Sequence, residues 1–233
     1  MKTISAASFA LLVLASTCFS QNTPAPAASP LPTPPASEQL SKALENIAAV
    51  KPTPREQREQ AYAKLLEGQR YVWGAERLRS RAGRQHNSKL AREAFQRSVE
   101  LDPLLSEGYT ALAELAINSQ PQDADEGIRL ASLAAKVNPN NFGARRILAR
   151  LYTFKSRVAN GPFDSQAGQN AVTEWRHVAR LDPRNAEAWA LLSELYDKTG
   201  KTDESIDALG KWLSSAAPID TRFYQMLMGG QNL

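Results

Sequence analysis

Three copies of one 17-residue pattern most constrain how this chain can fold; they lie at residues 100–116, 136–152 and 180–196. Each copy has an aliphatic residue and then Asp or Asn before a proline, and a run rich in Ala and Leu after it. The three prolines, Pro103, Pro139 and Pro183, are 36 and 44 residues apart. A period in this range is typical of an array in which similar structural units stack on one another.

The units are predicted to be helical. From residue 38 onward, apolar residues fall at helical spacing, and no alternating apolar run is bounded by hairpin turns. Each Asp-Pro or Asn-Pro step predicts the end of one helix and the start of the next, because proline cannot continue a helix but fits its first turn. Thr53 is predicted to cap the first helix, with Glu56 closing a capping box. The chain is therefore expected to be all-α.

The pattern resembles the tetratricopeptide repeat (TPR), a helix-turn-helix unit of about 34 residues with large and small residues at set positions. The last copy matches it with Trp189, Leu192, Tyr196 and Gly200, and a first copy with Gly68 and Phe95. The resemblance covers residues 55–217 and implies a right-handed superhelix of about four repeats plus a C-terminal helix. In such repeats small residues let paired helices approach, and neighbouring repeats bury each other's apolar faces.

Two copies exceed the 34-residue length, with insertions around residues 79–88 and 156–168. The first insertion predicts longer helices. In the second, Asn160-Gly161-Pro162 predicts a helix break, after which Asp164 or Ser165 caps the next helix. Two interpretations stay open: the insertions are tolerated surface elaborations, or they mark one edge as a binding site.

The N-terminus predicts export. Lys2 precedes an apolar, small-residue run at residues 4–15, which is shorter than the ~20 residues of a transmembrane helix, so residues 1–20 read as a signal peptide. Cleavage after Ser20 would leave Gln21 as the mature N-terminus in the periplasm or outside the cell. An outer-membrane lipoprotein, cut before Cys18 and acylated there, is the alternative. Cys18 is the only cysteine, so a chain cleaved after Ser20 contains no disulfide.

The segments that flank the repeats have distinct compositions. Residues 21–37 contain six prolines and predict an extended linker. Residues 38–50 predict a short amphipathic helix with Leu40, Leu44 and Ile47 on one stripe; it either docks on the first repeat or folds on a partner. The TPR-like array is assigned to residues 54–217.

Residues 218–233 predict a capping helix followed by a tail. Phe223, Met226 and Leu227 share a face that is expected to pack near Ile206, Leu209 and Leu213 of the fourth repeat. Tyr224 and Met228 are expected on the outer side, where they offer a surface for self-association.

No catalytic, cofactor-binding or metal-ligating set is predicted. His86, in an expected turn, and His177, in an expected helix, lack the spacing of a metal motif, and neither a Gly-x-Ser-x-Gly elbow nor a phosphate loop occurs. The acidic side chains within residues 122–127 indicate the start of a helix rather than a calcium loop. A hydrolase is therefore the least favoured function.

Basic residues are concentrated near the first repeat, because residues 51–100 contain 12 basic and 6 acidic side chains, against 5 and 6 in residues 101–150. Arg77, Arg81 and Arg84 are expected on one helical face if the helix continues through them. This face is either simply solvated or attracts an anionic envelope surface. Nucleic acid is not an expected partner of an exported protein.

The resemblance also implies a groove lined by the first helix of each repeat. Carried over by position, the groove residues are Glu107, Thr110, Glu114, Asn118, Arg146, Arg150, Phe154, Glu187, Ala190, Glu194, Asp197 and Lys198. Arg146 and Arg150, four residues apart, either hold an acidic group of a partner or pair with Glu114, Glu187 or Glu194. The Asn and Lys pairs with which some family members clamp a peptide carboxylate are not reproduced.

These patterns predict a non-catalytic exported scaffold that binds a protein or peptide through its groove, in the assembly of an envelope complex. A lipid-anchored structural or pilot-like subunit is the alternative. The two functions predict different mature N-termini, free Gln21 or acylated Cys18.

Overall fold

The computed structural model describes residues 50–119, 121–157 and 162–215. Within these ranges the chain forms eight α-helices: α2 (Arg55–Arg77), α3 (Arg81–Leu101), α4 (Ser106–Ile117), α5 (Ala124–Val137), α6 (Phe142–Ser156), α7 (Ser165–Leu181), α8 (Ala186–Lys198) and α9 (Thr202–Ser214). The only β-type pairing in this part of the chain is an isolated bridge between Arg157 and Phe163. The prediction of an all-α fold is confirmed.

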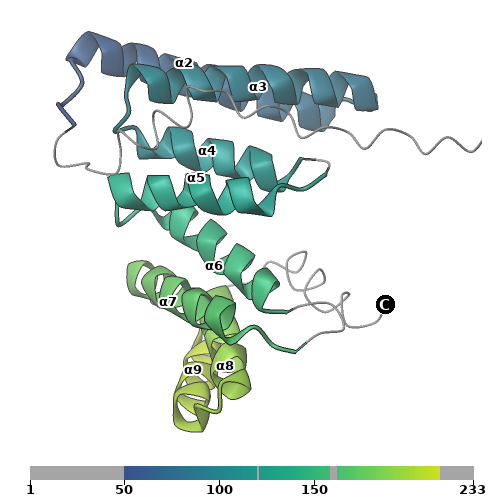
Figure 1. Cartoon of the computed structure of the whole chain (residues 1–233), viewed down its shortest axis with the longest axis vertical. Helices are drawn as coiled ribbons and strands as arrows, with labels where there is room; N and C mark the ends of the chain where they lie inside the picture. The colour runs from purple at the N-terminus through teal and green to yellow at the C-terminus, as the bar shows by residue number, and fades with distance from the viewer. Residues whose placement is uncertain (1–49, 120, 158–161, 216–233) are drawn as a thin grey trace, which may run out of the picture. The chain divides into compact units, whose positions relative to one another are not determined.

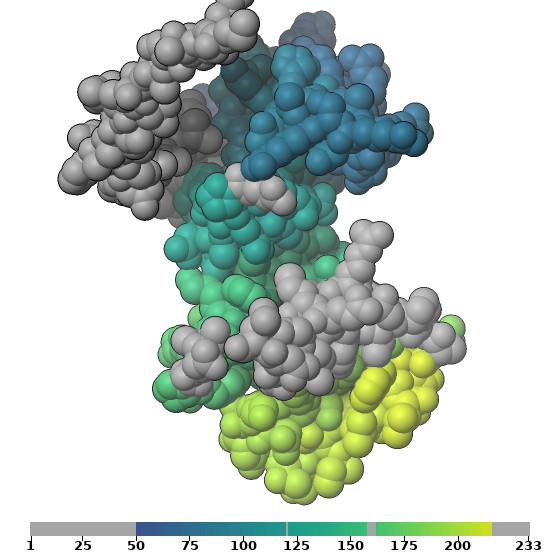
Figure 2. Space-filling model, turned by 90° about the vertical axis from the view of Figure 1, so that its right-hand side faces the viewer, coloured from purple at the N-terminus to yellow at the C-terminus, as the bar shows by residue number. Residues whose placement is uncertain are grey.

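The helices form four consecutive pairs (Figure 1). Helix α2 packs against α3, α4 against α5, α6 against α7, and α8 against α9. The second helix of each of the first three pairs also packs on the first helix of the next pair. Figure 2 shows the colours of the pairs following one another in chain order. The four pairs correspond to the four predicted repeats.

Small residues allow the helices to approach closely. A Cβ atom added at Gly68 on α2 would lie 2.4 Å from the Phe95 ring of α3, which is 2 % exposed. A glycine also allows close contact between successive pairs. A Cβ atom added at Gly108 on α4 would lie 2.5 Å from Val99 of α3. The large side chain fills the space that the glycine leaves open, so each contact requires both residue types.

Turns centred on the three repeated prolines join one pair to the next. The side chains of Asp102, Asn138 and Asp182, each just before a proline, accept a hydrogen bond from the backbone N–H two residues later. Such turns let the chain reverse over a few residues. Two residues after the proline, Asn141 and Asn185 cap α6 and α8 by accepting from Ala144 N and Ala188 N, respectively.

A third contact recurs at these junctions. The side chain six residues after each proline donates a hydrogen bond to that proline's carbonyl oxygen. The donors are Tyr109 Oη to Pro103 (3.2 Å), Arg145 Nε to Pro139 (3.1 Å) and Trp189 Nε1 to Pro183 (2.9 Å). Three different residue types therefore close the first turn of each following helix in the same way.

The first helix begins differently from its prediction. Pro54 occupies the N-cap position of α2, and no side chain caps it. The Thr53 hydroxyl instead donates to Asp102 Oδ1 at 2.7 Å, 49 residues along the chain. The predicted capping box at Thr53 is wrong, because the junction at Asp102 offers that hydroxyl a carboxylate acceptor.

Both insertions lie within a helix pair, as expected, and not at a junction between pairs. The first lengthens α2 to 23 residues and α3 to 21, and Ser80 caps α3 by accepting from Gly83 N. In the second, Asp164 caps α7 by accepting from Gln166 N and Ala167 N, which confirms the prediction. Helix α8 ends at Lys198, and Gly200, two residues later, is in the left-handed region (φ 72°).

The predicted signal peptide (1–20), linker (21–37), all but the last residue of the amphipathic segment (38–50) and the C-terminal helix and tail (218–233) lie outside the described residues. Val50, the end of the amphipathic segment, is partly buried against the core cluster formed by helices α2 to α6. The described array ends at Ser215, two residues before its predicted boundary.

Gly68→Ala is expected to destabilise the protein by about 1–3 kcal/mol, because the added methyl group overlaps the buried Phe95 ring. The matched control is Gly210→Ala on α9, where a Cβ atom meets nothing within 4 Å. The control should stabilise by about 0.5–1 kcal/mol, because alanine favours the helix. Urea unfolding midpoints test both variants. A Gly68→Ala variant as stable as the parent would contradict the role assigned to the glycine.

Candidate functional site

The predicted groove residues lie on the first helices of three pairs, α4, α6 and α8. The structure exposes Glu107, Glu114, Asn118, Phe154, Asp197 and Lys198, partly buries Thr110, Arg146, Arg150 and Glu194, and buries Glu187 and Ala190. The exposed members are those available to a partner. The buried and half-buried members hold the first helices to one another.

Helices α4 and α6 are joined by a short polar chain. Asn141 Nδ2 donates to Thr110 Oγ1 at 3.0 Å, and the Thr110 hydroxyl donates to the Ser106 carbonyl at 3.1 Å. A Cβ atom at Gly143 would lie 3.0 Å from Thr110 Cγ2, so the two helices are close at this point. Thr110 therefore fixes the spacing of α4 and α6 rather than offering a hydrogen bond to a ligand.

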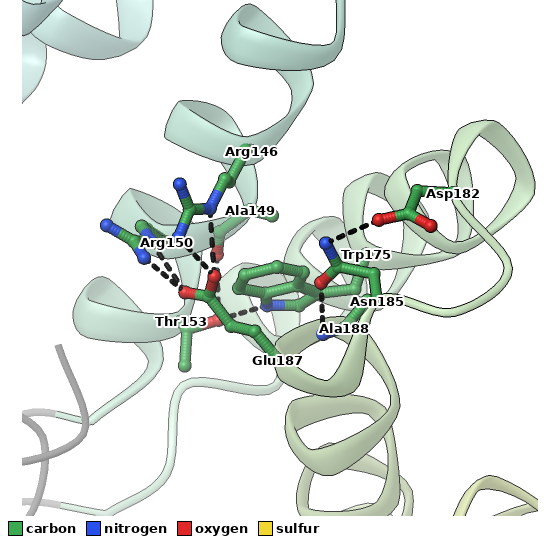
Figure 3. A network of polar contacts seen from close by, with 9 residues as sticks. All are labelled: Arg146, Ala149, Arg150, Thr153, Trp175, Asp182, Asn185, Glu187 and Ala188. Carbon is green, nitrogen blue, oxygen red and sulfur yellow. Dashed lines mark hydrogen bonds and ion pairs between the residues drawn. The ribbon is translucent and has the colours of Figure 1, made fainter. Parts of the chain in front are cut away.

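A carboxylate from α8 joins α8 to α6 (Figure 3). Glu187, 4 % exposed, accepts from Arg146 Nη2 and Arg150 Nη2, each at 2.6 Å. The Nε atoms of both arginines also donate to it, at 2.8 and 2.7 Å. Of the two interpretations of these arginines, the structure shows pairing with Glu187. Charge-assisted hydrogen bonds of this kind fix geometry as well as adding energy.

A buried hydrogen bond lies beside this cluster (Figure 3). Trp175 Nε1 on α7 donates to Thr153 Oγ1 on α6 at 2.9 Å, and the Thr153 hydroxyl donates to the Ala149 carbonyl at 2.7 Å. Trp175 and Thr153 are both 0 % exposed. At the far end of α6, Arg157 forms an ion pair with Glu194 of α8. Three arginines of α6 and its C-terminal cap are thus bound to carboxylates of α8.

Glu187→Gln is expected to destabilise the protein by about 2–4 kcal/mol, because it leaves two half-buried guanidinium groups facing each other without their counter-charge. Glu59→Gln is the matched control, since it removes the carboxylate of a well-exposed pair with Arg55. The control should stay within about 0.5 kcal/mol of the parent. Thermal unfolding measures the stability of both variants. Equal losses of stability would show that the Glu187 cluster contributes no more than an exposed ion pair.

Glu114 on α4 has a partly desolvated carboxyl. Its side chain is exposed, yet desolvation by the surrounding protein raises the pKa of its carboxyl above 4.5, while Arg146 acts in the opposite direction. Because the side chain is exposed, Glu114 is a predicted groove residue whose carboxylate a partner's basic group can reach.

Glu114→Gln is expected to raise the melting temperature at pH 7. The pKa of Glu114 is higher in the folded chain than in the unfolded chain, so its ionisation costs stability as the pH rises above the ordinary carboxyl value. Below about pH 4 the carboxyl is protonated in both states, and the difference from the parent should vanish. Calorimetry at the two pH values tests this. A lower melting temperature at pH 7 would mean that attraction to Arg146 outweighs desolvation.

Sequence reasoning missed an apolar stripe on α2. Tyr62, Leu66 and Trp73 fall on one side of the helix and are 48 %, 63 % and 62 % exposed. The pKa of Tyr62 is raised by burial and by the carboxylates of Glu107 and Asp102, so the Tyr62 end of the stripe lies near the start of α4. The sequence signal for this stripe is the i, i+4, i+11 spacing of large apolar residues. It was missed because the register of the first helix was uncertain from the sequence.

The predicted basic face does not form. Helix α2 ends at Arg77 and α3 begins at Arg81, so Arg77, Arg81 and Arg84 do not share one helix. Arg84 Nη1 donates to the carbonyls of Leu78 and Arg79 at 2.9 and 2.8 Å, which satisfies the end of α2. The helix break between Arg77 and Arg81 therefore removes the geometric basis for an anion-binding face.

The two histidines do not form a site. His86 lies in α3 and not in a turn, so that prediction was wrong. His177 lies in α7, and burial together with nearby Arg145 lowers its pKa. In the described ranges, no three His, Cys, Asp or Glu residues are grouped to hold a metal ion. None of the described helices is both long enough and apolar enough to cross a membrane.

Comparisons with known proteins bear on the fold. No protein-family model matches the sequence, and no curated protein matches it. Among solved structures, MamA matches with a TM-score of 0.51 at 16% identity, over 75% of this chain and 85% of MamA. A second MamA structure gives a TM-score of 0.50 at 15% identity, over 77% and 84% of the two chains. YrrB, described as a TPR protein with an unusual peptide-binding site, gives 0.49 at 14% identity, over 85% and 86%.

The deciding observation is the agreement of the two MamA matches with four helix pairs that pack in sequence through small residues. The chain has the tetratricopeptide-repeat fold. The TPR pattern explains why Gly68 lies against Phe95 and why Trp175 is buried between α6 and α8, since large and small residues alternate between paired helices.

Proposed function

We propose that this TPR protein is a non-catalytic scaffold that binds a segment of another protein along the surface of its first helices. Solenoids of helix pairs present continuous surfaces of this kind. The proposal also places the protein in the cell envelope, in the assembly of a complex. That location depends on residues 1–20, which lie outside the described residues.

The observation that carries the proposal is the exposed apolar stripe of Tyr62, Leu66 and Trp73 on α2, together with the exposed acidic groups Glu107 and Glu114 on α4. Exposed aromatic side chains grouped on one face are typical of protein-binding surfaces. Phe154 on α6, 46 % exposed, adds a third aromatic group among the first helices.

The ion pairs of α6 and its C-terminal cap argue against an acidic ligand. Arg146 and Arg150 are bound to Glu187, and Arg157 is bound to Glu194. A ligand carboxylate would have to compete with these internal partners. The partner segment is therefore expected to carry aromatic or aliphatic anchors together with Lys or Arg near Glu107 and Glu114, rather than an acidic motif.

Peptides selected from a displayed random library on the immobilised protein should combine apolar anchors with basic residues. Leu66→Lys is expected to weaken their binding about tenfold, because it removes an apolar contact of ~1.4 kcal/mol or more. The matched control is Leu181→Lys on α7, at an exposed leucine of a second helix. Fluorescence anisotropy measures both affinities. Peptides that bind Leu66→Lys as tightly as the parent would overturn the proposal.

A further inference from the structure

Two helix faces are exposed in this structure although their equivalents elsewhere in the array are buried. Among the described helices, α2 packs against α3 and α9 packs against α8, whereas every helix between them packs on helices of two pairs. Within the described ranges, no second helix precedes α2 and no first helix follows α9. The side chains on these two faces indicate which contact each face is suited to make.

The open face of α2 is formed by Ala63, Leu66 and Arg70. Each later first helix has Ala or Ser ten residues after its proline, and the family resemblance places Gly68 at the same point. Two residues earlier stand Leu66 in α2 and Ala111, Ile147 and Leu191 in the later helices. Those three are 9 %, 6 % and 0 % exposed, but Leu66 is 63 % exposed. Leu66 thus stands at a buried junction position without the helix that would cover it.

Ser205 aligns α9 with the other second helices. Its hydroxyl donates at 2.8 Å to the carbonyl of Ser193, which stands ten residues after the proline of its junction. In the second pair, a Cβ atom added at Gly127 of α5 would lie 3.9 Å from the carbonyl oxygen of Ala113, also ten residues after a proline. Ser205 and Gly127 therefore occupy the same place in their pairs.

The open face of α9 is formed by Ile206, Leu209 and Leu213. Leu213, eight residues after Ser205, is 77 % exposed. Its equivalents in α3, α5 and α7 stand four residues before each proline and are 3 %, 6 % and 5 % exposed: Val99, Ala135 and Ala179. Leu213 likewise stands at a position that a first helix covers at the other three places.

The first junction shows how the two positions meet. A Cβ atom added at Gly108 on α4 would lie 2.5 Å from Val99 on α3. By the intervals above, Ala63 of α2 corresponds to Gly108, and Leu213 of α9 corresponds to Val99. The other first helices also have a small, fully buried residue at this place, Ala144 and Ala188. The two open faces therefore offer the same contact of a large with a small side chain that the chain makes within itself.

A second internal contact sets the direction of the helices. A Cβ atom added at Gly127 on α5 would lie 3.1 Å from Leu151 Cδ1 on α6. On the open faces, Ser205 stands at the place of Gly127 and Arg70 at the place of Leu151. Arg70 departs from the leucine, but the exposed Glu204 beside Ser205 offers it an opposite charge.

Both contacts can form at once. Leu213 and Ser205 are eight residues apart on α9, and Ala63 and Arg70 are seven residues apart on α2. These intervals span about 12 and 10 Å of helix, so the two helices match when they run antiparallel.

We propose that α9 of one copy of this protein packs on α2 of a second copy, with Leu213 against Ala63 and Leu66, so that the stack of helix pairs continues from one chain into the next. Charge favours this pairing, because residues 51–100 contain 12 basic and 6 acidic side chains and residues 186–214 contain 3 and 6. Two α9 faces would instead bring acidic groups together. The contact is heterologous, so each copy can bind one neighbour through α2 and another through α9.

This self-association goes beyond the proposed ligand binding and shares Leu66 with it. A ligand segment held at Leu66 and the α9 helix of a second copy therefore exclude each other. Leu213 belongs to self-association alone, so variants at Leu66 and Leu213 separate the two functions.

Sedimentation velocity tests the proposal with two variants of the full chain. The parent should self-associate as its concentration rises, and Leu66→Asp and Leu213→Asp should each weaken this association at least tenfold. An equimolar mixture of the two variants should form dimers and nothing larger, because each variant retains one intact face and the two faces are complementary. Leu181→Asp, at an exposed leucine of α7, is the control and should associate like the parent.

Three results would rule out the proposal. A parent that stays monomeric, or a mixture that does not form dimers, shows that the faces do not bind each other. Self-association that survives Leu66→Asp but not Leu213→Asp assigns the α9 face to another α9 face. A lower melting temperature of monomeric Leu213→Asp means that its own chain covers Leu213, since a solvent-facing position should be almost neutral.

Peptide binding keeps this proposal separate from the proposed function. Peptides selected on the protein should bind Leu213→Asp as tightly as the parent, bind Leu66→Asp more weakly, and dissociate the assembled parent. A monomeric parent whose peptide binding depends on Leu66 would rule out self-association and leave ligand binding standing. Dimers in the mixture, with peptide affinity unchanged by Leu66→Asp, would do the reverse.

Discussion

The proline-centred junction is the constraint on which the rest of the stack depends. It ends a second helix, reverses the chain through a side-chain-capped turn, and starts the next first helix at a set distance. Because neither helix pair can bury its apolar face alone, the junction determines which faces meet. The contact of Gly108 with Val99 across the first junction depends on that spacing.

Local signals made most of the fold predictable. Prolines and caps act within a few positions along the chain, so the sequence predicted the helix pairs and a cap at Asp164 or Ser165, of which the structure shows Asp164. The family resemblance placed Gly68 at a small-residue position, and the helices approach closely there. Thr53 was the exception, because its hydroxyl binds Asp102, 49 residues away. A side chain with a strong local preference can still find a better acceptor in the tertiary structure.

The candidate site was less predictable because its interactions cross between repeats. The sequence placed Arg146 and Arg150 on one helical face but left their partner open. Glu187, 37 and 41 residues farther on, becomes that partner only when α6 and α8 lie side by side. The α2 stripe was missed for a related reason: Leu66 could be recognised as exposed only once the packing of α2 on α3 was known.

Ion pairs between first helices set both the geometry of the surface and its chemistry. A half-buried arginine that is bound to an internal carboxylate contributes to spacing, and a ligand gains little by replacing that partner. Under the proposed function, recognition falls to side chains that the stack does not use, namely the aromatic and aliphatic groups of α2, Phe154 and the acidic groups of α4. Glu114 takes part both in the electrostatics between first helices and in the exposed surface. Arg146 lowers the pKa of its carboxyl against the effect of desolvation, and the side chain is exposed. A basic ligand group beside Glu114 would meet a carboxylate whose hydration the surrounding protein has already weakened, so it would gain more there than at a fully solvated carboxylate.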